Sequence, residues 1–138
     1  MSKQRGFNLI ELMVVLTIVG IIASVAMPSY QQYVLKTYRK DDGMPALLDI
    51  MRAQENYFAN KYSYTDDMVF LNYGANSAAY TIPSGRYEIS ASECDTSTPL
   101  TACVLLTATP LGAQIADGNL TLNSRGIRQH KGVDGWLK

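Results

Sequence analysis

The sequence predicts an α+β protein in which one long helix packs on a small antiparallel β-sheet. An apolar run over residues 7–27 continues into a helical pattern that extends to about residue 59. Three short segments with alternating apolar residues follow between residues 86 and 128. A sheet that is apolar on one face needs a cover, and an amphipathic helix provides one.

The apolar run has the properties of a membrane span. Glu11 is the only charged residue in residues 7–27. A helix of this length measures roughly 31 Å, close to the hydrocarbon thickness of a bilayer. Lys3 and Arg5 precede the run without any acidic residue, so the amino end stays in the cytoplasm. Because a carboxylate in lipid is costly, Glu11 is expected to have a partner.

The stretch GFNLIELMVVLTIVGIIASVAMPSY closely resembles the amino terminus of type IV pilins and related pseudopilins. The resemblance implies a leader over residues 1–6, which a prepilin peptidase removes by cutting between Gly6 and Phe7. The same enzyme would then methylate the new amino group of Phe7. It also implies the type IV pilin fold, with residues 7–27 as the transmembrane and assembly helix and residues 28–138 as a globular domain outside the inner membrane.

Three further residues take their expected roles from this resemblance. The carboxylate of Glu11 would pair with the terminal amine of a neighbouring subunit during filament assembly. Gly20 and Pro28 would let the helix lose helicity in the filament. The alternatives are a glutamate that snorkels to the headgroups, an ordinary transmembrane glycine and a proline that ends the span.

Beyond Pro28 the helical pattern is expected to continue to about residue 59. Gly43 and Pro45 predict a kink or a short interruption, and Asp41 and Asp42 can cap the new start. An apolar stripe predicted to pack in the core then follows, made of Leu47, Ile50, Met51, Tyr57 and Phe58.

The second half of the chain is expected to hold a loop, a sheet and a tail. The loop covers about residues 60–85, and the helix end and loop start resemble those of PilE-type minor pilins. The sheet covers about residues 86–128, with strands in RYEIS, CVLLTAT and NLTLN. Residues 129–138 are expected to form a tail beyond the sheet.

The chain has two cysteines, Cys94 and Cys103. An even number behind an export-type amino end predicts one disulfide, which would close a loop of about ten residues between two strands. A zinc site is not expected, because the single histidine is far from both cysteines in sequence. Pilins usually bridge a loop near the carboxyl terminus, so this sequence departs from its family and leaves the tail unbridged.

The charges are balanced overall, with twelve basic and twelve acidic residues. The end of the chain is nevertheless basic, because after Asp117 only Asp134 is acidic. Candidate DNA contacts lie here, with Trp136 as an aromatic ring that could stack on a base: Arg125, Arg128, His130 and Lys131. A solvated tail is the alternative.

The sequence shows no catalytic constellation, and no enzymatic activity, cofactor or metal site is expected. The leading hypothesis is a minor pilin that is anchored in the bacterial inner membrane and then inserted into a type IV pilus. Its partners would be other pilin subunits, both major and minor, the prepilin peptidase and the inner-membrane assembly platform. A major pilin, a DNA-binding pilin for natural transformation and a type II secretion pseudopilin remain alternatives.

Overall fold

The computed structural model describes residues 8–75 and 78–137 of the chain. It divides into two compact units, Met1–Val34 and Leu35–Lys138. The leader over residues 1–6 and the predicted cleavage site between Gly6 and Phe7 lie outside the described residues.

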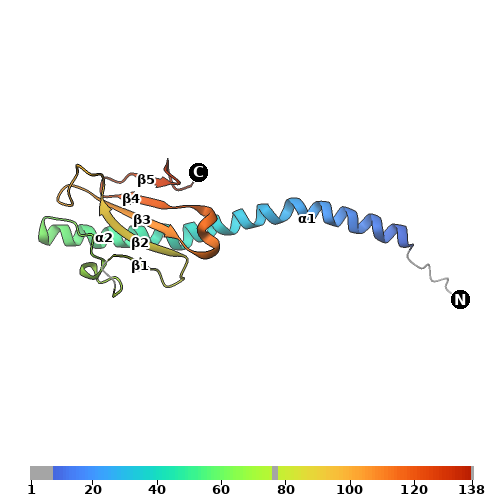
Figure 1. The fold of residues 1–138 in the computed structure, drawn as a ribbon, viewed down its shortest axis with the longest axis horizontal. Helices are drawn as coiled ribbons and strands as arrows, with labels where there is room; N and C mark the ends of the chain where they lie inside the picture. Colours follow the sequence, from blue (N-terminus) through green and yellow to red (C-terminus); the bar gives the residue numbers. More distant parts are fainter. Residues whose placement is uncertain (1–7, 76–77, 138) are drawn as a thin grey trace. The chain divides into compact units, whose positions relative to one another are not determined.

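The described part of the first unit is helical from Leu9 onward, and α1 ends at Tyr38 in the second unit (Figure 1). α1 covers Leu9–Tyr38, a single π-helical turn η1 covers Arg39–Gly43, and α2 covers Met44–Lys61. α1 passes through Gly20 and Pro28 without a break. Asn8 stabilises the start of α1, because its backbone carbonyl accepts from the amides of Glu11 and Leu12 at 3.0 and 3.2 Å.

The predicted interruption near Gly43 takes the form of the π turn η1, which widens the helix and does not end it. The expected capping by Asp41 and Asp42 is wrong, because neither end of η1 nor the start of α2 has a side-chain cap. The carboxylate of Asp42 instead accepts a hydrogen bond from Arg86 at 2.7 Å. Pro45 lies in the first turn of α2, where its missing N–H costs no hydrogen bond.

The segment predicted as a loop contains two short elements. η2 (Met68–Leu71) is a 3₁₀ turn whose Val69 amide donates to the side chain of Asp67, and β1 covers Tyr80–Thr81. Gln54 ties the start of this segment to α2, because its carboxamide donates to the carbonyl of Thr65 and accepts from its amide.

The described part of the second unit carries an antiparallel sheet with the strand order β1-β2-β3-β4-β5-β6. The strands after β1 are β2 (Tyr87–Glu93), β3 (Val104–Pro110), β4 (Leu120–Asn123), β5 (Arg128–His130) and β6 (Val133–Asp134), with the 3₁₀ segment η3 (Gly112–Asp117) between β3 and β4. The three predicted strands are present as β2, β3 and β4. The expectation that residues 129–138 form a tail beyond the sheet is wrong, because β5 and β6 extend the sheet into them.

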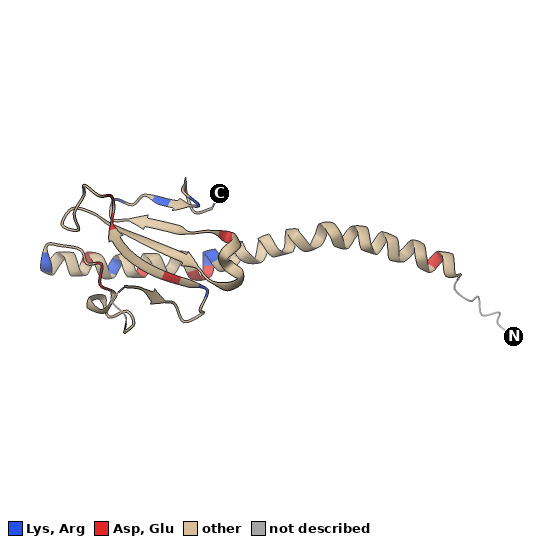
Figure 2. Cartoon of the chain, in the orientation of Figure 1, with Lys and Arg blue, Asp and Glu red and all other residues tan. Residues whose placement is uncertain are grey.

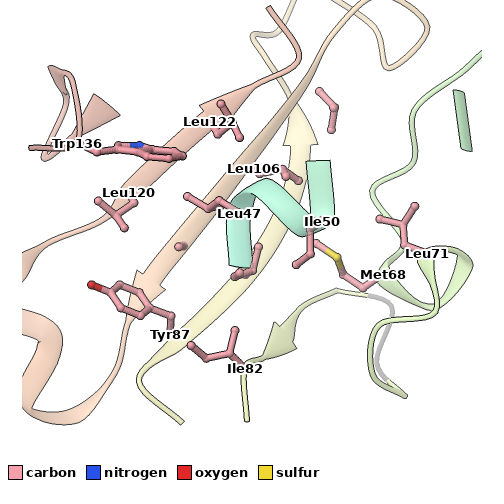
Figure 3. Close-up of a cluster of buried hydrophobic side chains, with 13 residues drawn as sticks. Leu47, Ile50, Met68, Leu71, Ile82, Tyr87, Leu106, Leu120, Leu122 and Trp136 are labelled. Carbon is pink, nitrogen blue, oxygen red and sulfur yellow. The ribbon is translucent and has the colours of Figure 1, made fainter. Parts of the chain in front are cut away.

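The core lies between α2 and one face of the sheet, as the α+β class predicts (Figure 3). Leu47 and Ile50 of α2 are fully buried, together with Leu106 of β3 and Leu120 of β4. The other predicted stripe residues, Met51, Tyr57 and Phe58, are only half-buried. Trp136, near the carboxyl end, also belongs to the core and is 5% exposed.

Gly43 allows a close approach between η1 and the sheet. A Cβ atom placed there would lie 2.8 Å from the Cδ1 atom of Leu120 and 3.1 Å from the ring of Tyr87. The backbone of Gly43 is right-handed helical, so its role is to leave space and not to adopt an unusual conformation. The glycine therefore lets η1 rest directly on the sheet.

The predicted disulfide between Cys94 and Cys103 is confirmed and closes the β2–β3 connection. The two Cα atoms are 5.7 Å apart, and Cys103 is fully buried. Inside the loop, Asp95 accepts hydrogen bonds from Ser97 and Thr98, which lower the pKa of its carboxyl to about 2.

Candidate functional site

The amino-terminal half of α1 presents an apolar surface with one charge. Figure 2 shows this stretch in tan apart from one red, acidic position near its beginning, which is Glu11 in the first turn. A carboxylate at this place also benefits from the partial positive charge of the helix amino terminus. The structure places Glu11 on an exposed helix surface, where it is open to a partner from outside the described residues.

No residue of α1, which is described in full, is buried. Its large apolar side chains are half or more exposed at most positions, including Leu9, Ile10, Leu16, Ile21 and Val25. A surface of this kind is stable when lipid or other apolar helices cover it. The helix is long and apolar enough to cross a membrane.

Hydroxyl side chains along α1 bond back to the helix itself. The hydroxyl of Thr17 donates to the carbonyl of Met13 at 2.8 Å, and that of Ser24 donates to the carbonyl of Ile21 at 2.7 Å. These bonds satisfy polar groups that lipid would leave without partners. Pro28 lacks an N–H, so the helix lacks one backbone bond at this position.

At the other end of the chain, three of the four candidate DNA contacts lie on the surface. Arg125 stands in the turn between β4 and β5, Arg128 on β5 and Lys131 in the turn to β6, and all three are exposed. We call Arg125, Arg128 and Lys131 the basic end. Figure 2 shows basic positions on β5, at the side of the sheet away from β1.

The fourth candidate, His130, does not belong to this surface. It is 8% exposed, and its Nε2 atom contacts the carbonyl oxygen of Asp117. Trp136 is likewise inside, with its indole N–H donating to the carbonyl of Thr121 at 2.9 Å. The guanidinium of Arg128 lies 5.0 Å from the centre of the Trp136 ring. The prediction that Trp136 could stack on a base is therefore wrong, because Arg128 and the core cover its ring.

The structure contains a buried ion pair that the sequence did not reveal. Arg39 of η1 is 5% exposed, and its guanidinium donates to both carboxylate oxygens of Asp117, from Nε at 2.8 Å and from Nη2. Its Nη1 atom donates to the carbonyl of Trp136 at 2.9 Å. Arg39 thus joins the helix to the end of η3 and to the carboxyl-terminal segment.

Two further polar side chains complete this network. The hydroxyl of Tyr87 donates to Asp117 at 3.2 Å, and the carboxamide of Gln114 donates to Tyr87, Asp117 and the carbonyl of Leu35. The Oε1 atom of Gln114 is buried with no partner among the described residues. Burial alone would raise the pKa of Asp117, but the hydrogen bonds and charge of Arg39 outweigh it and hold that pKa below its ordinary value. Burial also raises the pKa of Tyr87, and the charge of Asp117 adds to this effect.

Within residues 8–75 and 78–137, no group of three or more His, Cys, Asp and Glu side chains is placed to hold a metal ion. The polar network around Arg39 satisfies its buried groups by internal hydrogen bonds, apart from the Oε1 atom of Gln114, and its role is structural. The surfaces that can bind a second molecule are the apolar helix and the charged parts of the globular unit.

Comparison with known proteins agrees with this description. Residues 1–27 match the family model described as the prokaryotic N-terminal methylation motif, and the helix-on-sheet fold that follows is that of a type IV pilin. Residues 28–121, more than half of the chain, match the family model described as type IV minor pilin ComP, DNA uptake sequence receptor. The chain therefore belongs to the type IV pilin family.

Curated relatives are similar over shorter stretches. A fimbrial protein of Moraxella nonliquefaciens is 37% identical over 65 residues, which cover 44% of this chain and 42% of that protein. Fimbrial protein Q of Moraxella bovis is 54% identical over 37 residues, covering 27% of this chain and 24% of that protein. The type IV major pilin protein PilA of Myxococcus xanthus is 34% identical over 64 residues, covering 46% and 29%. The chain thus spans less than half the length of these relatives.

A prepilin signal followed by an apolar helix fits a protein that is held in the inner membrane and then enters a pilus on the cell surface. The basic end begins at Arg125, beyond the last residue of the minor-pilin match.

Proposed function

We propose that this chain is a minor subunit of a type IV pilus and that its globular domain binds DNA. The family model that matches residues 28–121 is described as a minor pilin and as a DNA uptake sequence receptor, which supports both parts. Relatives described as fimbrial or major pilin proteins favour a major subunit instead. The amount of this chain in sheared pili, relative to other pilins, distinguishes the two, and a minor subunit is a small fraction of the total.

The assembly part of the proposal concerns the amino end. Prepilin peptidase would cut between Gly6 and Phe7 and methylate Phe7, and the apolar part of α1 would then pass from the membrane into the filament. There the carboxylate of Glu11 would neutralise the terminal amine of a neighbouring subunit, which removes two charges that an apolar environment disfavours. Other pilins and the inner-membrane assembly platform are the proposed partners. The role is structural and not catalytic.

The DNA part rests on the exposure of the three cations of the basic end, which lie in the β4–β5 turn, on β5 and in the β5–β6 turn. Arginine and lysine bind phosphate, and the resulting affinity falls as salt rises because counterions are released. β5 rises by about 3.3 Å per residue, so Arg128 and Lys131 are separated by roughly 10 Å along the strand direction. Cations at this spacing can contact different phosphates of one nucleic-acid strand.

Trp136 supports this surface indirectly. Its ring packs under Arg128 and holds the guanidinium at the surface, so it contributes position and not stacking on a base. Lys131 is held in a similar way, because its ammonium group donates to the carbonyl of Ala116 at 3.1 Å. The phosphate backbone is therefore the part of DNA that this surface is suited to bind.

The test uses the full chain in lipid nanodiscs and a fluorescent DNA duplex, with binding followed by anisotropy at several salt concentrations. The variant Arg125→Ala/Arg128→Ala/Lys131→Ala should bind more weakly. The slope of log affinity against log salt should fall in magnitude by about 0.9 for each phosphate contact that is lost.

The matched control is Arg52→Ala/Lys61→Ala, which removes two exposed cations from α2. It should retain the affinity of the unchanged chain. Equal loss in both variants would mean that binding is a general charge effect, and unchanged binding in the triple variant would remove the basic end from the proposal.

A further inference from the structure

Lys131, in the turn between β5 and β6, is held in a fixed position against η3. Its backbone φ angle is +53°, in the left-handed region that most residues avoid, and strain of this kind is concentrated at functional positions. Its side chain crosses Gly118, where a Cβ atom would lie 2.5 Å from the Cγ atom of Lys131. The ammonium group then donates to the carbonyl of Ala116 at 3.1 Å. Because an ammonium has three N–H donors, the described residues leave two of them for another acceptor.

Two aliphatic side chains close to Lys131 are exposed to water. Ile115, next to Ala116 in η3, is 64% exposed, and Val133, the first residue of β6, is 57% exposed. Neither belongs to the core of the globular unit. We call Ile115, Lys131 and Val133 the η3 corner. A cation accompanied by exposed apolar side chains suits a phosphate group that has hydrocarbon beside it, as in a phospholipid bilayer.

The acidic side chains near the η3 corner do not cancel its charge. Asp117, the last residue of η3, is 4% exposed and is paired with Arg39. Asp134 follows Val133 on β6, where neighbouring side chains point to opposite faces, and it accepts a hydrogen bond from Gln129 at 3.3 Å. The η3 corner therefore presents a positive charge to its surroundings.

The η3 corner lies close, along the chain, to the end of the membrane span. η3 contacts the helix where the second unit begins, because Gln114 donates to the carbonyl of Leu35 at 2.9 Å (Figure 1). The apolar run ends at Met27, eight residues before Leu35, and α1 is continuous between them. At about 1.5 Å per residue, this stretch of helix is roughly 12 Å long. The η3 corner is thus within reach of a membrane surface while the chain is anchored.

Two further lysines follow the helix residues that contact η3. Lys36 comes directly after Leu35, Lys40 comes directly after Arg39, and both lysines are exposed. They are four positions apart, so they share one side of the helix. Asp41 is the exposed acidic residue that follows them. With Lys131, these lysines give this part of the globular unit an excess of exposed positive charge.

We propose that the η3 corner binds the headgroup layer of an anionic phospholipid bilayer while the chain is anchored in the membrane. Lys131 donates to a lipid phosphate, and Ile115 and Val133 enter the apolar boundary beneath the headgroups. The contact holds the globular unit against the membrane and is broken when the chain leaves the membrane for a pilus. It depends on the membrane anchor and not on DNA binding.

The first experiment detects the lipid directly. A photoreactive aliphatic amino acid replaces Ile115 in full chains reconstituted in phosphatidylglycerol liposomes, and mass spectrometry measures the lipid adducts at this position after illumination. The matched control carries the same amino acid in place of Ile127, which is 50% exposed and lies in the turn at the other end of β4. Adducts should be several-fold more frequent at position 115. Equal yields at the two positions, or no adduct at position 115, would overturn the proposal.

The second experiment tests the charge of Lys131. Lys131→Asn removes the ammonium but supplies a residue that tolerates the left-handed backbone, and Lys131→Arg retains the positive charge. Lys131→Asn should lower the adduct yield at position 115 roughly fivefold, the preference that one lysine provides near an anionic surface. Lys131→Arg should retain the yield, and phosphatidylcholine in place of phosphatidylglycerol should lower it. A yield that none of these changes alters would contradict the role of Lys131.

The folding of each variant is checked in the same liposomes. Trp136 is the single tryptophan of the chain and belongs to the core, so its fluorescence reports whether the carboxyl-terminal segment is packed. A variant with the emission of the unchanged chain and fewer adducts has lost the lipid contact and not its fold.

The lipid contact and the proposed DNA binding share Lys131, but other variants separate them. With the photoreactive amino acid at position 133, Ile115→Ser should lower the adduct yield and leave DNA binding unchanged. Arg125→Ala should weaken DNA binding and leave the adducts unchanged. If Ile115→Ser weakens DNA binding and leaves the lipid adducts as they were, Ile115 belongs to the DNA surface and the lipid proposal falls.

Discussion

Arg39 and Asp117, which are 78 positions apart in the chain, form an ion pair that is almost completely shielded from water. The guanidinium uses two of its nitrogen atoms on the carboxylate and a third on the carbonyl of Trp136. A buried pair contributes little net stability when compared with apolar replacements, but the loss of one partner is costly. This contact therefore holds the helix, η3 and the carboxyl-terminal segment in one arrangement.

Replacing one member of this pair should destabilise the globular unit. Asp117→Asn keeps the shape of the side chain but leaves Arg39 charged and buried, so we expect a loss of about 3–5 kcal/mol in the free energy of unfolding. Urea unfolding of the full chain in micelles measures it. Arg52→Ala removes an exposed ion pair and should change the value by less than about 1 kcal/mol. Equal effects would mean that burial of the first pair is unimportant.

The lowered pKa of Asp117 predicts how the stability of the globular unit depends on pH. The pKa of Asp117 is lower in the folded chain than its ordinary value of 3.8. Its contribution is therefore fully present above about pH 4 and is lost as the pH falls through the folded-state pKa. Unfolding measured between pH 5 and 2 should show a steeper loss for the unchanged chain than for Asp117→Asn. Parallel curves would assign the acid sensitivity to other carboxylates.

Gly43→Ala tests the close approach of η1 to the sheet. The added methyl group would overlap Leu120 and press on Tyr87, and overpacking of this kind costs about 1–3 kcal/mol. Thermal unfolding of the full chain should shift to lower temperature. Gly20→Ala is the matched control, because a Cβ at Gly20 meets nothing within 4 Å. A Gly43→Ala chain as stable as the control would show that the neighbouring side chains move aside freely.

The disulfide should stabilise the globular unit by a moderate amount. It closes a loop between residues nine positions apart, which corresponds to about 2–3 kcal/mol on the chain-entropy model. Cys94→Ala/Cys103→Ala should lower the free energy of unfolding by this amount, and reduction of the unchanged chain should have a similar effect. If the double variant is less stable but reduction leaves the stability of the unchanged chain as it was, the packing of Cys103 and not the covalent bond provides the stabilisation.

Glu11→Ala tests the assembly helix. The variant should leave the globular unit folded, because its core and hydrogen bonds lie in the second unit, but less of it should enter pili. The measurement is the ratio of the chain in sheared pili to the chain in the membrane. Thr17→Ala, a neutral change on the same exposed helix, should leave the ratio unaltered. Normal incorporation of Glu11→Ala would contradict the charge-pairing role.

The elements whose apolar residues recur at a regular spacing could be predicted from the sequence. Strands β2, β3 and β4 alternate apolar and polar residues, and α2 carries an apolar stripe, so both could be predicted from local pattern. β5 and β6 are three and two residues long, which is too short for a period to be visible. Trp136 is buried in the core, whereas the neighbouring apolar residues Val133 and Leu137 are exposed, so apolar character alone did not separate them.

Some residues of the candidate site could be predicted from the sequence and others could not, depending on whether they are neighbours in the sequence. The charges of the basic end stand together in sequence, whereas Arg39 and Asp117 meet only through the fold. Within the run Arg39–Asp42, all four residues suggest a solvated surface, and only the direction of the π turn separates the buried Arg39 from the exposed Lys40. The cleft between the helix and β1 likewise joins Asp49 of α2 to Tyr73 and Tyr80, which lie more than twenty positions further along the chain.

The π turn at Arg39–Gly43 also affects how far the apolar stripe of α2 is rotated about the helix axis. Such a turn holds about one residue more than an α-helical turn, and each residue advances a helix by about 100°. The direction in which Leu47 and Ile50 point therefore depends on the length of this turn. Deleting a single residue there would rotate the core-facing stripe by more than a quarter of a revolution, so a change in chain length at this place acts as a change in orientation.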